Sequence, residues 1–109
     1  MLVLFDKPYL SDLFFTGKTT DKKHRFQPDI VRRYQKVVNF MQAAESITAL
    51  AMINSLNYEL LVGDKAGISS VRVNDQYRVE FVLDVSSDQP SLTICNILEL
   101  SNHYKKKKK

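Results

Sequence analysis

Two neighbouring segments that alternate apolar and polar residues constrain this sequence more than any other feature. In Ser69–Val73 the valines alternate with a serine and an arginine, and in Tyr77–Leu83 an aromatic or aliphatic residue stands at every second position. A period of two is typical of a strand with one buried face. Only Asn74–Gln76 separates the segments, and asparagine tolerates the backbone conformations that such short loops need. The sequence therefore predicts a β-hairpin.

The length of the connecting loop sets which residues face each other. A three-residue loop, Asn74–Gln76, places Arg72 opposite Arg78 and gathers the apolar residues of both strands on the other face. A two-residue loop would mix the two faces, which a half-buried sheet does not tolerate. We therefore expect the two arginines to share one face of the hairpin.

Two arginines directly opposed across a pair of strands repel each other. One interpretation is that an anion lies between or beside Arg72 and Arg78. The other is that both side chains are solvated, with Glu80 as a partner. The residues alone leave both interpretations open.

The remaining elements follow from helix and strand signals along the chain. Proline suits the first turn of a helix, and glycine suits the position after its end, as at Gly17. Apolar residues at helical spacing then predict the helices, and short apolar runs predict the strands. The predicted elements are an edge strand at Leu2–Phe5, helices at Pro8–Phe15 and Pro28–Ala44, a short helical piece at Ile47–Met52, the hairpin, and a last strand at Ser91–Leu98.

This order of elements predicts the fold class. A strand and two helices come first, and three strands without intervening helices follow, which indicates an α+β fold. We expect a three-stranded, mainly antiparallel sheet with the helices packed on one face. The last strand has apolar residues on both faces, so Cys95 is expected to be a small buried side chain rather than a nucleophile.

The length of the chain limits the number of domains, and its positive charge is concentrated at one end. At 109 residues it predicts one domain, residues 1–104, followed by a lysine tail at residues 105–109. The formal net charge is +4, but the five terminal lysines more than account for it, since residues 1–104 carry −1. Such a tail can bind nucleic acid through counterion release, or it can be a solvated end.

Several classes of protein are disfavoured by the composition. No apolar run approaches the roughly 20 residues that span a bilayer, and the first residues lack the pattern of a leader peptide. The single cysteine cannot form an internal disulfide, and no motif with metal-ligand spacing is present. We expect a cytoplasmic protein without membrane contact, metal or cofactor.

The segment Leu61–Phe81 carries a family resemblance. Its pattern Leu-x-Gly-Asp-x-x-Gly-x-x-Ser-x-Arg-Val-Asn-Asp-Gln-Tyr-Arg-Val-x-Phe resembles the core of HigB-type toxins of the RelE/ParE toxin–antitoxin superfamily. A weaker resemblance extends from Leu10–Gly17 to the closing Ser-Asn-His-Tyr-Lys at 101–105. It implies the same α+β fold.

The resemblance also implies a chemistry. HigB-like toxins are ribosome-dependent endoribonucleases, in which the ribose 2′-OH attacks the neighbouring phosphate without a metal. Arg78 resembles the strand arginine that holds the scissile phosphate, and Arg72 is a second candidate on the same face. His103 resembles the C-terminal histidine that acts as general acid or base. Tyr104 would stack on a base or hydrogen-bond the substrate.

Further cations are candidates for RNA binding, although a basic loop is also commonly just solvated. They are Lys22, Lys23, Arg25, Lys65 and Lys105. The sequence departs from the family in two places. Glu59 and Val62 stand where relatives often have a His-x-x-Lys pair, and Ser101-Asn102-His103 stands where they often have Asp-Tyr-His. Lys65 or Glu59 would then take over the missing role, or RNA would be bound without being cut.

The resemblance implies partners as well. The chain would be neutralised by a HigA-like antitoxin with a helix-turn-helix domain, and it would reach DNA only through that antitoxin. Its substrate would be mRNA on the ribosome. The alternative functions are a noncatalytic binding module of the same fold and a toxin directed at DNA gyrase.

Overall fold

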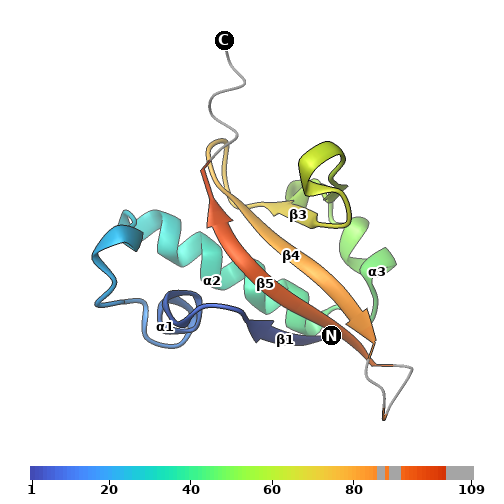
Figure 1. Cartoon of the computed structure of the whole chain (residues 1–109), viewed down its shortest axis with the longest axis horizontal. Helices are drawn as coiled ribbons and strands as arrows, with labels where there is room; N and C mark the ends of the chain where they lie inside the picture. Colours follow the sequence, from blue (N-terminus) through green and yellow to red (C-terminus); the bar gives the residue numbers. More distant parts are fainter. Residues whose placement is uncertain (86–87, 89–91, 103–109) are drawn as a thin grey trace.

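The computed structural model describes residues 1–85, 88 and 92–102 and has one sheet with helices packed against it (Figure 1). The helices are α1 (Pro8–Thr16), α2 (Pro28–Ala43) and α3 (Ile47–Ala51), with 3₁₀ turns η1 (Lys22–His24), η2 (Asn54–Leu56) and η3 (Gly63–Lys65). The strands are β1 (Leu2–Phe5), β2 (Glu59–Leu60), β3 (Ser69–Arg72), β4 (Arg78–Val85) and β5 (Thr93–Ser101).

The sheet is larger than the sequence predicted. It has five strands in the order β1-β5-β4-β3-β2, and β1 runs parallel to β5 while the other pairs are antiparallel. The prediction of a three-stranded sheet was therefore wrong. Strand β2 has only two residues, too few for a periodic pattern, and alternation within β1 does not reveal which strand it will pair with. The edge position predicted for β1 is confirmed.

The two long helices begin at the predicted residues, and each ends within one residue of its predicted end. Pro8 and Pro28 occupy their first turns, and Gly17 ends α1 in the left-handed conformation (φ 76°) with its N–H donating to the Leu13 carbonyl. The apolar stripe of α2 is buried, and Tyr34 in this stripe donates a hydrogen bond from its hydroxyl to the Leu10 carbonyl at 2.8 Å. This bond fastens α2 to α1.

The register of the β3–β4 hairpin is the predicted one. Arg72 pairs with Arg78, and Val71 pairs with Val79. The valines lie in the core, as expected. The opposite face is less open than expected, because Ser70, Arg78 and Glu80 on this face are also buried.

A bulge in β5 explains how this strand serves two faces. Cys95 and Ile97 are fully buried on the core face. Phe81 pairs with Ile97 and the preceding Glu80 pairs with Glu99, so Leu98 is an extra residue in β5. After this bulge, Glu99 lies on the face opposite the core and Leu100 lies in the core again. Cys95 is the buried hydrophobe that the sequence predicted, and burial raises the pKa of its thiol to about 11.

Candidate functional site

Arg78 begins β4 and is buried, with 7% of its surface exposed. Its Nε donates to Ser70 Oγ at 2.9 Å, and its Nη2 donates to the Asn57 carbonyl at 2.5 Å. Asn57 has a positive φ of 43° at the end of η2, a conformation that asparagine tolerates better than most residues. The turn after η2 thus brings a backbone oxygen to the guanidinium, and the interpretation of Arg78 as a solvated side chain was wrong.

A row of carboxylates crosses the sheet beside Arg78. The strand pairing aligns Glu59, Ser70, Glu80 and Glu99 from β2 to β5. Glu59 Oε1 lies 4.0 Å from Arg78 Nη2, and the Glu59 side chain is 48% exposed. Glu59 is therefore a solvent-accessible carboxylate next to a fixed guanidinium, at a position where relatives often have histidine.

Glu80 and Lys65 form the tightest ion pair of this face. Lys65 Nζ donates to both carboxylate oxygens of Glu80, at 3.0 and 2.9 Å. The carboxylate is 3% exposed, and the lysine is 33% exposed. Lys65 thus holds η3 against β4 through its pair with Glu80, and its predicted role in RNA binding stays a prediction.

The balance of charge on this face follows from these contacts. The described cations of this face are Lys65 and Arg78, and the described carboxylates are those of Glu59, Glu80 and Glu99. A phosphate that approaches Arg78 therefore meets negative charge as well as positive charge. Within residues 1–85, 88 and 92–102, the charges of this face can orient a phosphate at one point but are not in positive excess.

The structure separates the two arginines that the sequence placed together. Their backbones pair, yet the Arg72 guanidinium is bonded to Asp75, three residues along the chain. Its side chain is 38% exposed and borders a groove formed with α2. The Arg72 guanidinium therefore contacts Asp75 while the Arg78 guanidinium contacts Ser70 and Asn57, and a joint role of the two arginines at one phosphate stays a prediction.

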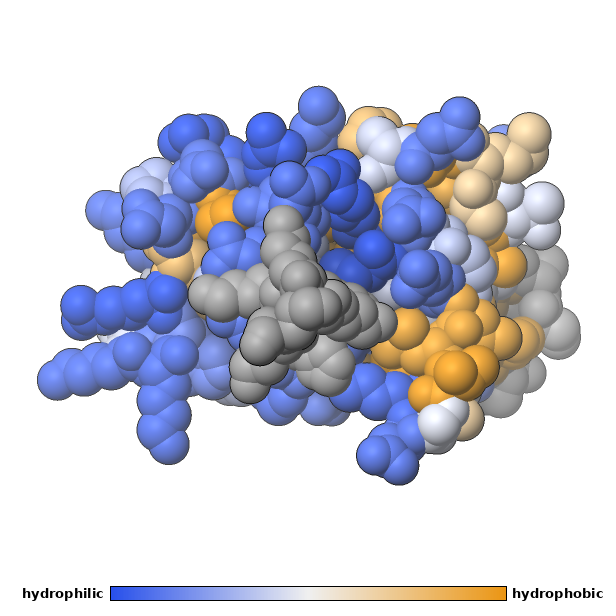
Figure 2. Space-filling view, turned by 90° about the horizontal axis from the view of Figure 1, so that it is seen from above, coloured by the Kyte–Doolittle hydropathy of each residue, from blue (hydrophilic) through white to orange (hydrophobic). Residues whose placement is uncertain are grey.

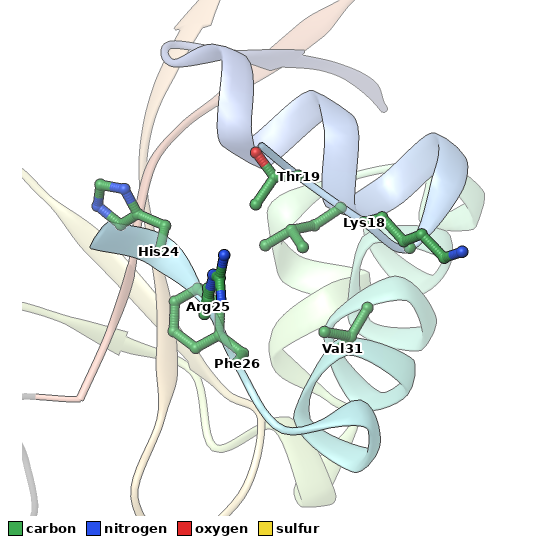
Figure 3. Close-up of a pocket in the computed structure, with 8 residues that line it drawn as sticks. Lys18, Thr19, His24, Arg25, Phe26 and Val31 are labelled. Carbon is green, nitrogen blue, oxygen red and sulfur yellow. The ribbon is translucent and has the colours of Figure 1, made fainter. Parts of the chain in front are cut away.

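The basic loop between α1 and α2 forms a second polar region. Lys22, Lys23 and Arg25 are exposed, as predicted for a solvated or phosphate-binding loop. A pocket of about 330 Å³ lies beside the loop, with Arg25 and Phe26 on one side and Val31 of α2 on another (Figure 3). RNA binding by these exposed cations stays a prediction.

His24 is a residue whose setting the sequence did not reveal. Its ring stacks on the ring of Tyr9 with centroids 3.7 Å apart, and its Nδ1 lies 2.9 Å from Asp21 Oδ2. The hydrogen bond with His24 lowers the pKa of Asp21, and burial raises the pKa of Tyr9 to about 12. The Tyr9 hydroxyl accepts from the Leu100 N–H at 3.2 Å, so this cluster lies near the end of β5. An acidic residue three positions before a histidine was the available signal.

Three predicted site residues, His103, Tyr104 and Lys105, lie outside the described residues. The last described positions before them are Ser101, the strand partner of Arg78, and Asn102. Hydrophilic side chains cover most of the end of the molecule at which β5 finishes, with one apolar patch to the side (Figure 2). The described part of this end is therefore suited to a polar ligand.

Within residues 1–85, 88 and 92–102, no three histidine, cysteine or acidic side chains are grouped as a metal ion would require. In the same part of the chain, no helix has the length and apolar character to cross a bilayer.

Comparison with known proteins identifies the relationships of the chain. A family model described as the RelE-like toxin of the type II toxin–antitoxin system HigB matches residues 4–94. Among solved structures, a YoeB/ParE toxin from Agrobacterium tumefaciens superposes with a TM-score of 0.58 at 17% identity, covering 95% of this chain and 100% of that chain. No curated protein matches the sequence significantly. At this identity the structural likeness establishes the fold alone.

Proposed function

The chain belongs to the HigB-like family of RelE-like type II toxins, and from this premise we propose that it is a ribosome-dependent endoribonuclease that cuts mRNA. The observation that carries the proposal is the setting of Arg78. A guanidinium on the first residue of a central strand is fixed by Ser70 and Asn57 and lies beside Ser101, at the end of β5. A fixed cation of this kind stabilises charge that develops on a phosphate without having to reorganise.

The proposed reaction needs no external nucleophile. The ribose 2′-oxygen attacks the adjacent phosphorus, the bond from phosphorus to the 5′-oxygen breaks, and a 2′,3′-cyclic phosphate and a 5′-hydroxyl result. A base accepts the proton of the 2′-OH, and an acid delivers a proton to the leaving 5′-oxygen. Arg78 would bind the nonbridging oxygens of the phosphate, on which negative charge builds up.

Two residues are candidates for the proton transfers. His103 follows the strand partner of Arg78 by two positions, a span of about 7 Å at most, and imidazole titrates near neutral pH. Tyr104 would then contact a base of the substrate. Glu59 is the candidate among the described residues, because its carboxylate is half exposed and lies 4.0 Å from Arg78 Nη2.

One observation favours a second function, a noncatalytic binding module or a toxin directed at gyrase. Glu59, Glu80 and Glu99 put three carboxylates beside Arg78, where RNA chemistry benefits from positive charge. In that case Arg78 would serve mainly to join β3, β4 and the turn after η2. Toxicity without mRNA cleavage would favour the toxin directed at gyrase.

Membership of a type II toxin family implies an antitoxin partner. We propose a HigA-like antitoxin with a helix-turn-helix domain, so that any contact with DNA is indirect, and mRNA on the cytoplasmic ribosome as the target. Lys22, Lys23, Arg25 and Lys105 remain candidates for contacts with the RNA.

Variants at Arg78 test the proposal, provided that loss of folding is separated from loss of chemistry. Arg78→Ala removes the bonds to Ser70 and Asn57, so it is expected to destabilise the fold as well. Arg78→Lys keeps the charge, and Ser70→Ala keeps the guanidinium while removing one of its partners. Each variant is added to a translation extract, and mRNA cleavage is measured beside its circular-dichroism melting curve.

Arg78→Lys and Ser70→Ala give distinct expectations. Arg78→Lys should fold and lose about 100-fold or more in cleavage rate, as when one donor to a developing oxyanion is removed. Ser70→Ala should lose about tenfold, because the guanidinium is less restrained. A folded Arg78→Ala protein that cuts at the wild-type rate would show that Arg78 is structural only.

A further inference from the structure

A basic groove lies between α2 and the end of β3, apart from the Arg78 face. Its volume is about 360 Å³. Helix α2, the η2 turn and β3 with the residue after it contribute its lining: Arg33, Lys36, Val37, Phe40, Ser55, Leu56, Arg72 and Val73. The groove thus combines three cations with an apolar floor.

The cations of this groove differ from those of the Arg78 face in their pairing. Arg33 and Lys36 are exposed, and among the described residues no carboxylate lies within ion-pair distance of either. Arg72 is bonded to Asp75, which restrains its side chain at the rim. Positive charge is therefore in excess, and a ligand that enters the groove gains by bringing negative charge.

The floor of the groove adds a requirement for a flat or apolar group. Lys36 Nζ lies 6.0 Å from the centroid of the half-buried Phe40 ring, so the lysine extends over the ring. Leu56 and Val73 continue the floor beside the ring. A positively charged groove with an aromatic side chain is the arrangement with which proteins hold single-stranded nucleic acid.

The position of the groove favours RNA over an acidic peptide. Arg72 at its rim is the strand partner of Arg78, so the groove begins one strand away from the proposed catalytic arginine. Among the described residues, the Arg78 face itself lacks an excess of positive charge. A strand of RNA that reaches Arg78 would need cations nearby to hold its backbone, and the groove supplies them.

We infer that this groove binds the phosphates of single-stranded RNA next to the cleavage site, with Arg33 and Lys36 as the main contacts and Arg72 at the junction. The inference rests on the proposed function for the identity of its ligand. The groove attracts the RNA, and Arg78 orients one of its phosphates.

The test is binding of a fluorescein-labelled 12-nucleotide RNA, followed by fluorescence anisotropy at several salt concentrations. The RNA carries 2′-O-methyl groups, so it cannot be cut, and binding is measured independently of catalysis. The variants are Arg33→Ala, Lys36→Ala and their combination, in the full chain. Arg32→Ala is the matched control, because Arg32 is an exposed arginine on the same helix that does not line the groove.

We expect the double variant to bind at least tenfold more weakly at low salt, while Arg32→Ala changes the affinity less than twofold. The slope of log affinity against log salt should fall by about 0.7 for each phosphate contact removed. The lysine tail is common to all proteins, so it does not affect the comparison. Equal effects of Arg33→Ala and Arg32→Ala would overturn the inference.

Two further arms separate the alternatives. If a 12-residue poly-glutamate peptide binds more tightly than the RNA, with the same dependence on Arg33, the groove takes an acidic protein segment, and the inference is wrong. Cleavage of mRNA by the wild type that is unchanged in the double variant would also refute the groove while leaving the proposed function intact. If the protein binds the RNA through Arg33 but never cuts mRNA, the proposed ribonuclease function is refuted and the groove is kept as an RNA-binding site.

Discussion

The Lys65–Glu80 pair allows a quantitative prediction about the face that carries Arg78. At a separation of 2.9 Å and an effective dielectric constant of about 20, the Coulomb attraction is about 6 kcal/mol. Burial of the carboxylate offsets much of this attraction, and the lysine is one-third exposed, so solvent screens it further. We expect a net coupling free energy of about 2 kcal/mol between the two side chains.

A double-mutant cycle measures this coupling. Urea unfolding of the wild type, Lys65→Met, Glu80→Gln and the double variant gives the interaction free energy directly. Lys22→Met is the control for loss of a lysine, because Lys22 is exposed and should cost less than about 0.5 kcal/mol. A coupling below about 0.5 kcal/mol would refute the reasoning.

The same variant also tests what Lys65 does. If its charge serves the fold, Lys65→Met should bind the 2′-O-methyl RNA as the wild type does at a temperature at which both are folded. A tenfold loss of RNA affinity without loss of stability would restore Lys65 as an RNA contact.

Three other predictions concern stability and titration. Tyr34→Phe removes a buried hydrogen bond to the Leu10 carbonyl and should lower the free energy of unfolding by about 1–2 kcal/mol in urea melts, with unchanged mRNA cleavage. The Cys95 thiol, with its pKa raised to about 11, should resist iodoacetamide at pH 8 until the protein unfolds. Because the folded state keeps the thiol proton longer than the unfolded state, stability should fall as the pH rises from about 9 to 11. Cys95→Ala should lose the part of this fall that occurs between about pH 9 and 10, since Tyr9, whose pKa is also raised, adds to the fall above about pH 10. The hydrogen bond with His24 lowers the pKa of Asp21. The ionised Asp21 therefore contributes to the free energy of unfolding above the ordinary carboxyl pKa of 3.8, and this contribution is lost as the pH falls through the pKa of the folded state. In urea melts, Asp21→Asn should make the free energy of unfolding less dependent on pH over that acidic range.

The hairpin shows what sequence reasoning can establish. The parity of the loop Asn74–Gln76 fixed the pairing of Arg72 with Arg78, because a shift by one residue would have turned every valine to the wrong face. Helix boundaries followed from proline and glycine in the same way. These features depend on residues close together in the sequence, and each of them is reported by a local pattern.

The setting of each arginine depends on distant parts of the chain, and sequence reasoning missed it. Arg78 is buried because the turn at Asn57 reaches over it, and Arg72 borders a groove because Arg33 lies opposite on α2. Neither contact leaves a periodic pattern. The parallel pairing of β1 with β5 and the two-residue strand β2 were missed for the same reason, since tertiary structure alone selects them.

The most direct test of the proposed ribonuclease is primer extension on an mRNA incubated with the purified wild-type protein, with and without translating ribosomes. We expect cuts only when ribosomes translate the mRNA, with a 2′,3′-cyclic phosphate on the upstream fragment and a 5′-hydroxyl on the downstream fragment. Intact mRNA in the presence of folded protein and active ribosomes would contradict this expectation, and the buried Arg78 would then be a structural residue of a binding module.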